Sequence, residues 1–555
     1  MKQLINSDIH KTKQWIFLII VSVLLVVFAL GFHQYAKTAT VMSVNTISNT
    51  KTPEHFSEKQ LTNSLMKDHA LNLLCNGHIV PFDKDSNIYY LSQNMNTPNW
   101  QGSLSLNSSD YYLYLVEDEL LSNKPEAIRT GHAFTIYVVS ETEYQPLSLV
   151  FTGLPLLNMT TQTAVEQHYS KDDVDNYYFN SETRYYGDIT IFNTAPNTES
   201  YQILSTGLCY HERGATSAIY KKKNYSLKLL EEDGTKNRQE LLGMKESGEW
   251  KLVSMYTDKS KVRDMTCLQL WEEIAEKETA FSEHGAQMAY CEVILDGTYM
   301  GLYGLLYPID EETLKLTSND SLFKVLGELP PTTSAFQYSM DNNYSVALPI
   351  RMRYPKEYNS VLPHWEPMKN YLTYAYWEPN AIIFSQLIDV RNAADFYIFL
   401  QATAASDNQL KNTYMVSRYL EDIGMHRTYI IPWDLNYSFG DCYKYDPNIL
   451  YTEFNDASSV IYMESGLKQL FDENIAGARD VLNYKWEQHR QNTLRTEHIK
   501  ELMQQNTDLL VNSGALSREN KIWPEVHNTS DLSQIFDYVD KRMTFLDEYF
   551  SQYEE

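Results

Sequence analysis

Three polar residues in the C-terminal half have the types and spacing of a phosphoryl-transfer site. Asp407 precedes Asn412 by five positions in "SDNQLKN". In the catalytic loops of protein kinases, an acid at this spacing accepts the substrate hydroxyl proton and the amide holds a metal ion. Asp434 ends the apolar run "YIIPWD", shortly before Gly440, as the second metal-binding acid of phosphotransferases does. The first spacing also arises by chance, and Asp407 could equally be the acid of a turn that ends a helix.

A predicted β-hairpin connects these two stretches. The sequence "NTYMVSRYLEDIGMHRTYIIPWDL" has two apolar runs around a turn at Asp422–Gly424, which is a hairpin pattern. Because a hairpin brings its two ends together, we expect Asp407, Asn412 and Asp434 to be neighbours. Two carboxylates and an amide offer oxygen ligands, which suit Mg²⁺ rather than zinc.

Lysines in "YKKKNYSLKLL" are candidates for binding phosphate groups. Side chains alternate along a strand, so Lys223 would share a face with Tyr225 and Leu227, whereas Lys228 would point to the other face. A lysine on an apolar face is costly without an anionic partner. The alternative is that these lysines lie on an exposed edge strand, where lysine is common.

The length, charge and motif content narrow the functional classes. A chain of 555 residues is expected to form two or three domains. A net charge of −26 argues against a general nucleic-acid-binding protein, although it leaves room for a local basic pocket. The sequence contains no phosphate-binding loop of the GxxxxGK[ST] type, no GxGxxG, no HExxH and no GxSxG. Five widely separated cysteines without a CxxC motif argue against both a disulfide framework and a zinc site.

The N-terminus predicts a membrane anchor. Residues Trp15–Phe32, "WIFLIIVSVLLVVFALGF", carry no charge and are roughly long enough to cross a bilayer as a helix. Lysines before this run place residues 1–14 in the cytoplasm, so the main domains of this single-pass protein would be extracytoplasmic. A cleaved signal peptide is the alternative, but the run is long and lacks a clear cleavage site. The polar residues 33–65 read as a stalk.

The rest of the chain predicts an α+β protein. Short apolar and aromatic runs separated by turn residues indicate a small β-sandwich-like module at 66–160, followed by a Tyr-rich linker at 161–186. From residue 187 onward strands come first and helices dominate after about 392, which indicates a β-rich lobe and a helical lobe. The stretch 318–390 fits no motif and could be a lid or an insertion between the lobes.

Four stretches in this second region resemble the CotH kinase family, which is named for a spore-coat protein and has an atypical kinase-like fold. They are "ERGATSAIYKKKNYSLKLL", "ELLGMKESGEWKLVSMYTDKSKVRD", "LDGTYMGLYGLLYPID", and the pair "SDNQLKNTYMV" and "IPWDLNYSFGD". They occur in the order of the family, and the resemblance covers roughly residues 187–548. The β-rich module before them is similar to modules that precede this domain in bacterial surface proteins.

The resemblance implies a protein kinase that uses ATP and Mg²⁺ and phosphorylates serine or threonine of a coat or surface protein. Asp407 would handle the substrate hydroxyl, with Asp434 as the second catalytic acid. Residues implied to hold Mg²⁺ are Asn412, Asp434 and Asn436. Residues implied to contact the nucleotide phosphates are Arg213, Lys223, Lys228 and Arg263. The implied partners are the protein substrate and the membrane, with no nucleic acid.

Two departures from the family pattern bear on activity. The family usually has an acid where this chain has Tyr307, and a second Asp where it has Asn436. An amide can offer a carbonyl oxygen to Mg²⁺ but brings no charge. We therefore keep a second function in view, namely a weak or inactive surface protein that uses the same fold for binding, adhesion or coat assembly. A metal hydrolase or glycosidase is a more distant reading, because no paired-carboxylate motif can be named.

Overall fold

The computed structural model describes most of the chain from residue 71 onward. The described residues are 47–48, 71–108, 110–115, 124–141, 144–168, 181–214, 216–278, 285–327, 350–355, 362–409, 411–441, 456–461 and 465–553. The membrane span predicted at 15–32 and the tail before it lie outside the described residues. Within the ranges given above, no helix has both the length and the apolar character that crossing a membrane requires.

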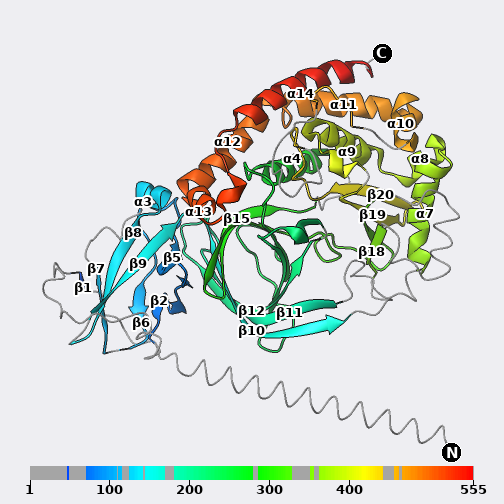
Figure 1. Cartoon of the computed structure of the whole chain (residues 1–555). Coiled ribbons are helices and arrows are strands. Elements are labelled where there is room, and N and C mark those ends of the chain that lie inside the picture. The colour runs from blue at the N-terminus through cyan, green and yellow to red at the C-terminus, as the bar shows by residue number, and fades with distance from the viewer. Residues whose placement is uncertain are drawn as a thin grey trace, which may run out of the picture.

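Two sheets form an N-terminal module where the sequence indicates a small β-sandwich (Figure 1). The larger sheet has the order β1-β7-β8-β9-β5-β4 and the smaller one β3-β2-β6. Their bounds are β1 Ile47–Ser48, β2 Leu73–Cys75, β3 His78–Ile79, β4 Phe82–Asp83, β5 Ile88–Ser92, β6 Leu104–Leu106, β7 Tyr112–Leu115, β8 Ala133–Val139 and β9 Tyr144–Thr152, with helix α3 at Pro125–Thr130. In β8, the buried Phe134, Ile136 and Val138 alternate with more exposed residues, so one face packs into the core. The short β1 pairs with β7, which places part of the predicted stalk in this sheet.

A closed seven-stranded barrel follows the module. Its order is β10-β11-β12-β13-β14-β16-β15, and the bounds are β10 Leu156–His168, β11 Ser181–Phe192, β12 Ile203–Arg213, β13 Asn224–Leu230, β14 Glu249–Val253, β15 Met288–Leu295 and β16 Thr298–Leu306. On β13, Tyr225, Leu227 and Leu229 fill the barrel interior. The predicted linker 161–186 instead contributes residues to β10 and β11, although residues 169–180 lie outside the described part. The barrel therefore begins upstream of residue 187.

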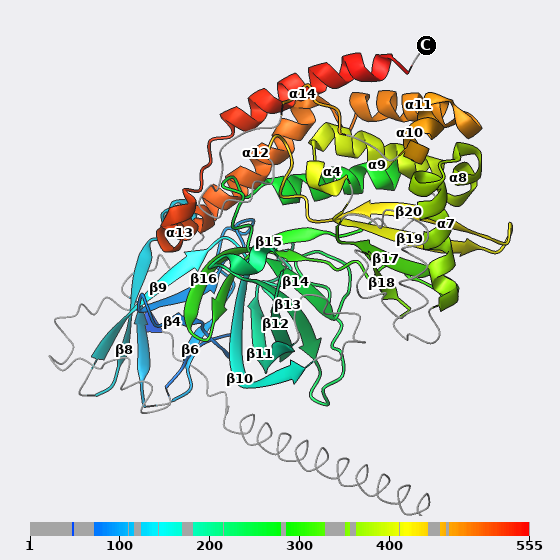
Figure 2. The ribbon, with the colours of Figure 1, turned by 45° about the vertical axis from the view of Figure 1, so that its right-hand side comes forward.

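A four-stranded sheet and a set of helices complete the molecule. The sheet has the order β18-β17-β19-β20, with β17 Ser321–Val325, β18 Ile350–Tyr354, β19 Thr413–Leu420 and β20 Met425–Pro432. The helices are α4 Arg263–Glu278, α7 Glu366–Leu372, α8 Ala381–Leu387, α9 Val390–Thr403, α10 Ser465–Asp472, α11 Ala478–Gln491, α12 Thr496–Asn512, α13 Ala515–Ile522 and α14 Ser533–Ser551. Figure 2 shows the sheet beside the barrel and under the helices. The stretch 318–390, which fits no motif, supplies β17, β18, α7 and α8.

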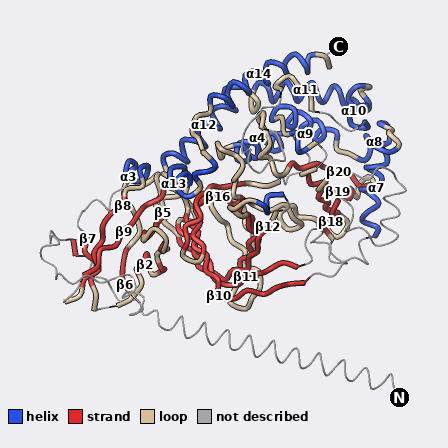
Figure 3. The backbone as a smooth tube through the Cα atoms, in the orientation of Figure 1, coloured by secondary structure: helices blue, strands red, loops and turns tan. Residues whose placement is uncertain are grey.

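The α+β class predicted from the sequence is confirmed. Figure 3 shows strands gathered in the module and barrel, and helices gathered on the opposite side of the molecule. One hydrophobic core joins α4, α9 and the later helices to the four-stranded sheet, while a second fills the barrel. The module shares its own core with the barrel through Phe192, Ile294 and Tyr299, and Tyr90 stacks on Tyr299 with ring centroids 4.8 Å apart. The module is thus packed directly against the barrel through a shared hydrophobic core.

Candidate active site

The hairpin predicted from the sequence is present and brings the three candidate residues together. Strands β19 and β20 pair antiparallel from Leu420↔Met425 to Thr413↔Pro432. The pairing continues one step further, because the Trp433 amide donates to the Asn412 carbonyl oxygen at 2.9 Å. Asp434 therefore leaves the hairpin beside Asn412, and Asp407 lies in the short turn after α9. All three side chains line the same cavity.

Two side chains that the sequence analysis did not single out hold these loops in place. The amide nitrogen Nδ2 of the buried Asn408 donates to the carbonyl oxygens of Asn412 at 2.8 Å and Trp433 at 2.6 Å. Asp264, in the first turn of α4, accepts a hydrogen bond from the Leu435 amide at 2.8 Å. One residue thus ties the two acidic loops to each other, and the other ties the second loop to a helix.

Backbone conformation explains the residue types at two of these positions. Asn412 has φ of 53° and Asp434 has φ of 60°. Asn and Asp tolerate this left-handed region better than other residues with a side chain beyond Cβ. The same two residues therefore satisfy the turn geometry and supply oxygen atoms to the cavity.

The two acids have different electrostatic surroundings. The Asp407 side chain is 14% exposed. It forms an ion pair with Lys411 Nζ at 2.8 Å and accepts a hydrogen bond from Asn412 Nδ2 at 2.8 Å. Asp434 is exposed at the wall of the cavity. Desolvation by the surrounding protein raises the pKa of Asp434, whereas the nearby Arg213 and Lys324 oppose that rise. Burial and Asp434 together raise the pKa of Asp264 to about 8.

The cavity lies between the barrel and the four-stranded sheet and has a volume of about 620 Å³. Eight basic and five acidic side chains line it, a basic excess in a chain whose net charge is −26. The basic residues are Arg184, Arg213, Lys228, Lys251, Lys324, Arg351, Arg353 and Lys411. Such a balance favours an anionic ligand with several charges.

The structure brings together only part of the predicted phosphate-binding set. Arg213 and Lys228 line the cavity, and so does the proposed metal ligand Asn436. Lys223 is not among the lining residues, and its Nζ donates to the Ala218 carbonyl oxygen at 2.6 Å. Lys223 lies one residue before β13, which begins at Asn224, so the alternation expected within a strand does not set the direction of its side chain.

Arg263 is also absent from the cavity lining, and it supports the site from a position behind it. Its guanidinium is fully buried and contacts Asp258 Oδ1 at 2.7 Å. Its Nε donates to the Ser438 carbonyl oxygen at 3.0 Å. Arg263 thus connects the loop after Asp434 to the start of α4, and it acts on the site through the backbone.

Six basic residues that the sequence analysis missed line the cavity, namely Arg184 on β11, Lys251 on β14, Lys324 on β17, Arg351 and Arg353 on β18, and Lys411 before β19. Burial, together with the charges of Arg213 and Arg353, lowers the pKa of Lys324 to about 7. Burial and Arg213 similarly lower the pKa of Lys251 to about 8. A signal was present in "SLFKV" and "IRMRY", where basic residues interrupt apolar strands.

Tyr307, where the family usually has an acid, does not enter the cavity. Its ring is buried in the barrel core and packs edge-to-face on Trp250, with centroids 6.1 Å apart. Asp310, three residues further along the chain, caps a turn by accepting a hydrogen bond from the Thr313 amide at 2.8 Å. The aromatic side chain therefore leaves the cavity open.

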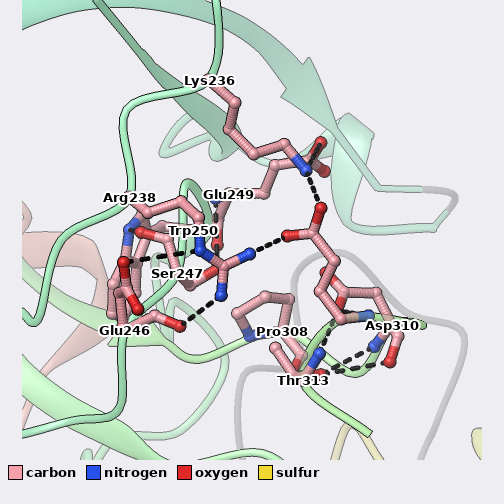
Figure 4. A network of polar contacts seen from close by, with 10 residues as sticks. Lys236, Arg238, Glu246, Ser247, Glu249, Trp250, Pro308, Asp310 and Thr313 are labelled. Atoms are coloured by element: carbon pink, nitrogen blue, oxygen red, sulfur yellow. Dashed lines mark hydrogen bonds and ion pairs between the residues drawn. The ribbon is translucent and has the colours of Figure 1, made fainter. Parts of the chain in front are cut away.

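A polar network holds the segment after the barrel (Figure 4). Glu312 contacts Lys236 at 3.2 Å and also Arg238, and Lys236 reaches Glu249 at 3.3 Å. Glu249 lines the cavity. The network thus joins the connection between barrel and sheet to one wall of the cavity.

The oxygen donors present fit Mg²⁺ bound together with phosphate groups. In the part of the chain that the structure describes, no three His, Cys, Asp or Glu side chains gather as a metal cage. The amide nitrogens of Asn412 and Asn436 donate to Asp407 and to Thr257 Oγ1, which leaves their carbonyl oxygens as acceptors. Mg²⁺ commonly uses one or two carboxylates, waters and substrate phosphates rather than an all-protein cage.

A comparison with protein-family models identifies the family. A family model described as "CotH kinase protein" matches residues 211–546, which is more than half of the chain and runs from the end of β12 into α14. A search of curated proteins found no match.

Proposed function

The chain belongs to the CotH kinase protein family, and from that premise we propose that it is an atypical protein kinase. The proposed reaction transfers the γ-phosphoryl group of ATP to a serine or threonine hydroxyl of a coat or surface protein. The observation that carries this proposal is that Asp407, Asn412 and Asp434 line the same cavity as an excess of basic side chains. A polyphosphate and an acceptor hydroxyl need these two features together.

The residues have distinct roles in this proposal. Asp407, held by Lys411 and Asn412, orients the acceptor hydroxyl and takes its proton as the bond to phosphorus forms. Arg213, Lys251 and Lys324 neutralise the charge on the transferring and leaving phosphate oxygens, as electrostatic catalysis requires. Bound Mg²⁺, held by Asp434 and the amide oxygens of Asn412 and Asn436, would supply further charge neutralisation to the phosphates. Asn408 and Asp264 keep the two loops in register.

The location is part of the same proposal. The apolar run at 15–32, preceded by lysines, supports a single-pass anchor with the main domains outside the cytoplasm. The substrate would then be a protein of the coat or cell surface. Protease protection of tagged cells separates the two topologies, because an extracytoplasmic catalytic region is cleaved without lysis of the membrane.

The direct test is Mg²⁺-dependent ATP binding and transfer by the full-length chain. We expect calorimetry to show micromolar ATP binding in the presence of Mg²⁺ and at least tenfold weaker binding after Mg²⁺ is chelated. The reason is that the basic side chains of the cavity alone neutralise the phosphates only partly. Transfer is followed by mass spectrometry of phosphoserine and phosphothreonine in candidate coat proteins. Absence of binding at millimolar ATP would refute the kinase proposal.

Binding of a polyanion should depend on pH through Lys324. Its pKa is lowered to about 7, and a bound phosphate favours the charged form, so binding takes up a proton. Affinity should therefore be highest below pH 7 and fall as the pH rises through 7 to 8, by up to about tenfold for one charge. In Lys324→Met the affinity should be lower, and this part of the pH dependence should be absent. A wild-type profile identical to that of the variant would contradict the assignment.

A second function is favoured by one observation. Asn436 stands where the family usually has an acid, and the described residues contain no group of three His, Cys, Asp or Glu side chains arranged to hold a metal ion. A protein that lost metal affinity could keep the cavity as an anion-binding surface module for adhesion or coat assembly. ATP binding that is independent of Mg²⁺, without transfer, would favour this function.

A further inference from the structure

Strands β17 and β18 present a basic face to the cavity, which we call the basic sheet wall and define as Lys324, Arg351 and Arg353. Lys324 lies directly opposite Arg351 in the antiparallel pairing and opposite Tyr414 on the other side. Residues opposite one another share a face of the sheet, and all these side chains line the cavity. The other face carries the buried Phe323, Val325 and Met352, which pack into the helical core.

Like charges on directly opposed strand positions are destabilising. Arg353, on the same strand as Arg351, adds to this crowding of positive charge: burial, Arg213 and Arg353 together lower the pKa of Lys324 to about 7. The basic sheet wall has three positive charges on one face of the sheet. Neutral residues at these positions would leave the hydrophobic core on the other face unchanged. An anionic ligand at this wall would remove the repulsion.

The wall extends beyond the reach of the catalytic acids. Arg351 and Arg353 lie on β18, at the edge of the sheet opposite to β20, the strand that leads to Asp434. In the sheet order β18-β17-β19-β20, β18 is two strands away from β19, which is about 10 Å at the usual strand spacing. An extended peptide covers this distance in about three residues.

We propose that Arg351 and Arg353 bind an anionic side chain of the acceptor protein, about three residues from the serine or threonine that is phosphorylated. The ligand group is a phosphate monoester or a carboxylate, since both match the planar guanidinium. This inference rests on the proposed kinase function. It assigns acidic or already phosphorylated segments as the substrate class and gives the unassigned stretch 318–390 a role in substrate choice.

The experiment measures peptide binding separately from phosphoryl transfer. Two matched sets of four fluorescent peptides share one acceptor serine. In one set the residue three positions before that serine varies, and in the other the residue three positions after it, and the variable residue is phosphoserine, glutamate, glutamine or serine. Anisotropy is recorded with the full-length chain saturated with a non-hydrolysable ATP analogue and Mg²⁺. The variants are Arg351→Gln/Arg353→Gln and, as a matched control, Arg427→Gln, which lies on β20 of the same sheet outside the cavity lining.

We expect the phosphoserine and glutamate peptides to bind at least about tenfold more tightly than the neutral ones, which is the scale of a charge-assisted contact. The double variant should lose this preference, while its affinity for the ATP analogue changes less than about threefold. The control should behave as wild type, and 0.5 M salt should weaken the preference. If the phosphoserine peptide binds more tightly than the glutamate peptide, the group bound by the two arginines is a phosphate. If the two peptides bind equally, the arginines accept either a phosphate or a carboxylate.

Two outcomes would overturn the proposal. One is equal binding of anionic and neutral peptides by the wild-type protein. The other is a parallel loss of ATP-analogue affinity in the double variant, which would assign the arginines to the nucleotide. Failure of the kinase function itself has a different signature, because the nucleotide would not bind and no transfer would occur, while the peptide preference measured without nucleotide would persist.

Discussion

Replacement of Asp434 by asparagine is expected to abolish Mg²⁺-dependent ATP binding and to lower phosphoryl transfer by roughly 10³-fold or more, on the scale seen when a preorganised charge is removed from a transition state. The side chain lies in the cavity near Arg213, Lys324 and Asp407. Its loss removes the carboxylate that the proposal assigns to Mg²⁺. The measurements are calorimetry with ATP and Mg²⁺, and a radiolabel transfer assay.

Asparagine is the appropriate replacement because the backbone at this position has φ of 60°, which asparagine adopts readily. We therefore expect the variant to unfold at nearly the wild-type temperature. Asn436→Asp provides the reverse test at a residue two positions away, because a second carboxylate in the cavity should tighten Mg²⁺ binding. Near wild-type transfer by Asp434→Asn would exclude this acid from catalysis, and unfolding of the variant would identify it as structural.

The site elements that could be predicted were those fixed by local sequence. The hairpin from Asn412 to Trp433 has a short turn and two matched apolar runs, so its register follows from its own residues. Once that register is known, the proximity of Asp407 and Asp434 needs no information from the rest of the chain. The α+β order of strands and helices is likewise local.

The residues that were missed or misplaced depend on contacts between distant segments. Arg351 reaches the cavity only because β18 pairs with β17, and β17 with β19, across long stretches of sequence. Lys223 precedes a strand whose apolar face closes a barrel, and the closure was not visible in the pattern of single strands. The Tyr-rich run at 161–186 read as a linker because the polar residues in its described parts, 161–166 and 183–186, lie on strands and are exposed or half-buried. In each case, the tertiary neighbour decided the role of the residue.

Replacement of Glu519 by glutamine should strongly destabilise the folded protein. Glu519 on α13 is fully buried and faces two fully buried lysines, with Lys222 Nζ at 2.6 Å and Lys261 Nζ at 3.8 Å. Its second oxygen accepts the Leu302 amide of β16 at 2.9 Å. Removing one partner of a buried pair leaves an uncompensated charge, so we expect the free energy of unfolding to fall by about 3–5 kcal/mol in urea titrations.

Lys221, which is adjacent to Lys222 in the sequence, forms an ion pair that serves as a matched control. Lys221 pairs with Glu525 at 3.3 Å, but their side chains are 76% and 38% exposed. Water screens this pair, so Glu525→Gln should change the unfolding free energy by no more than about 1 kcal/mol. Equal effects of the two substitutions would show that burial of the first pair does not govern its contribution.

The pH dependence separates an electrostatic cause from a packing defect. Burial lowers the pKa of Lys261 to about 8 and also lowers that of Lys222, and the charge of Glu519 opposes both shifts. Without that charge both values fall further, while the unfolded chain keeps its lysines protonated up to about pH 10. The unfolded variant then binds more protons than the folded one, so its stability rises with pH. The deficit relative to wild type should be largest at the lowest pH and shrink as the pH rises towards about 8, where Lys261 of the wild-type protein also loses its proton. A deficit that is constant from pH 6 to 9 would point to packing.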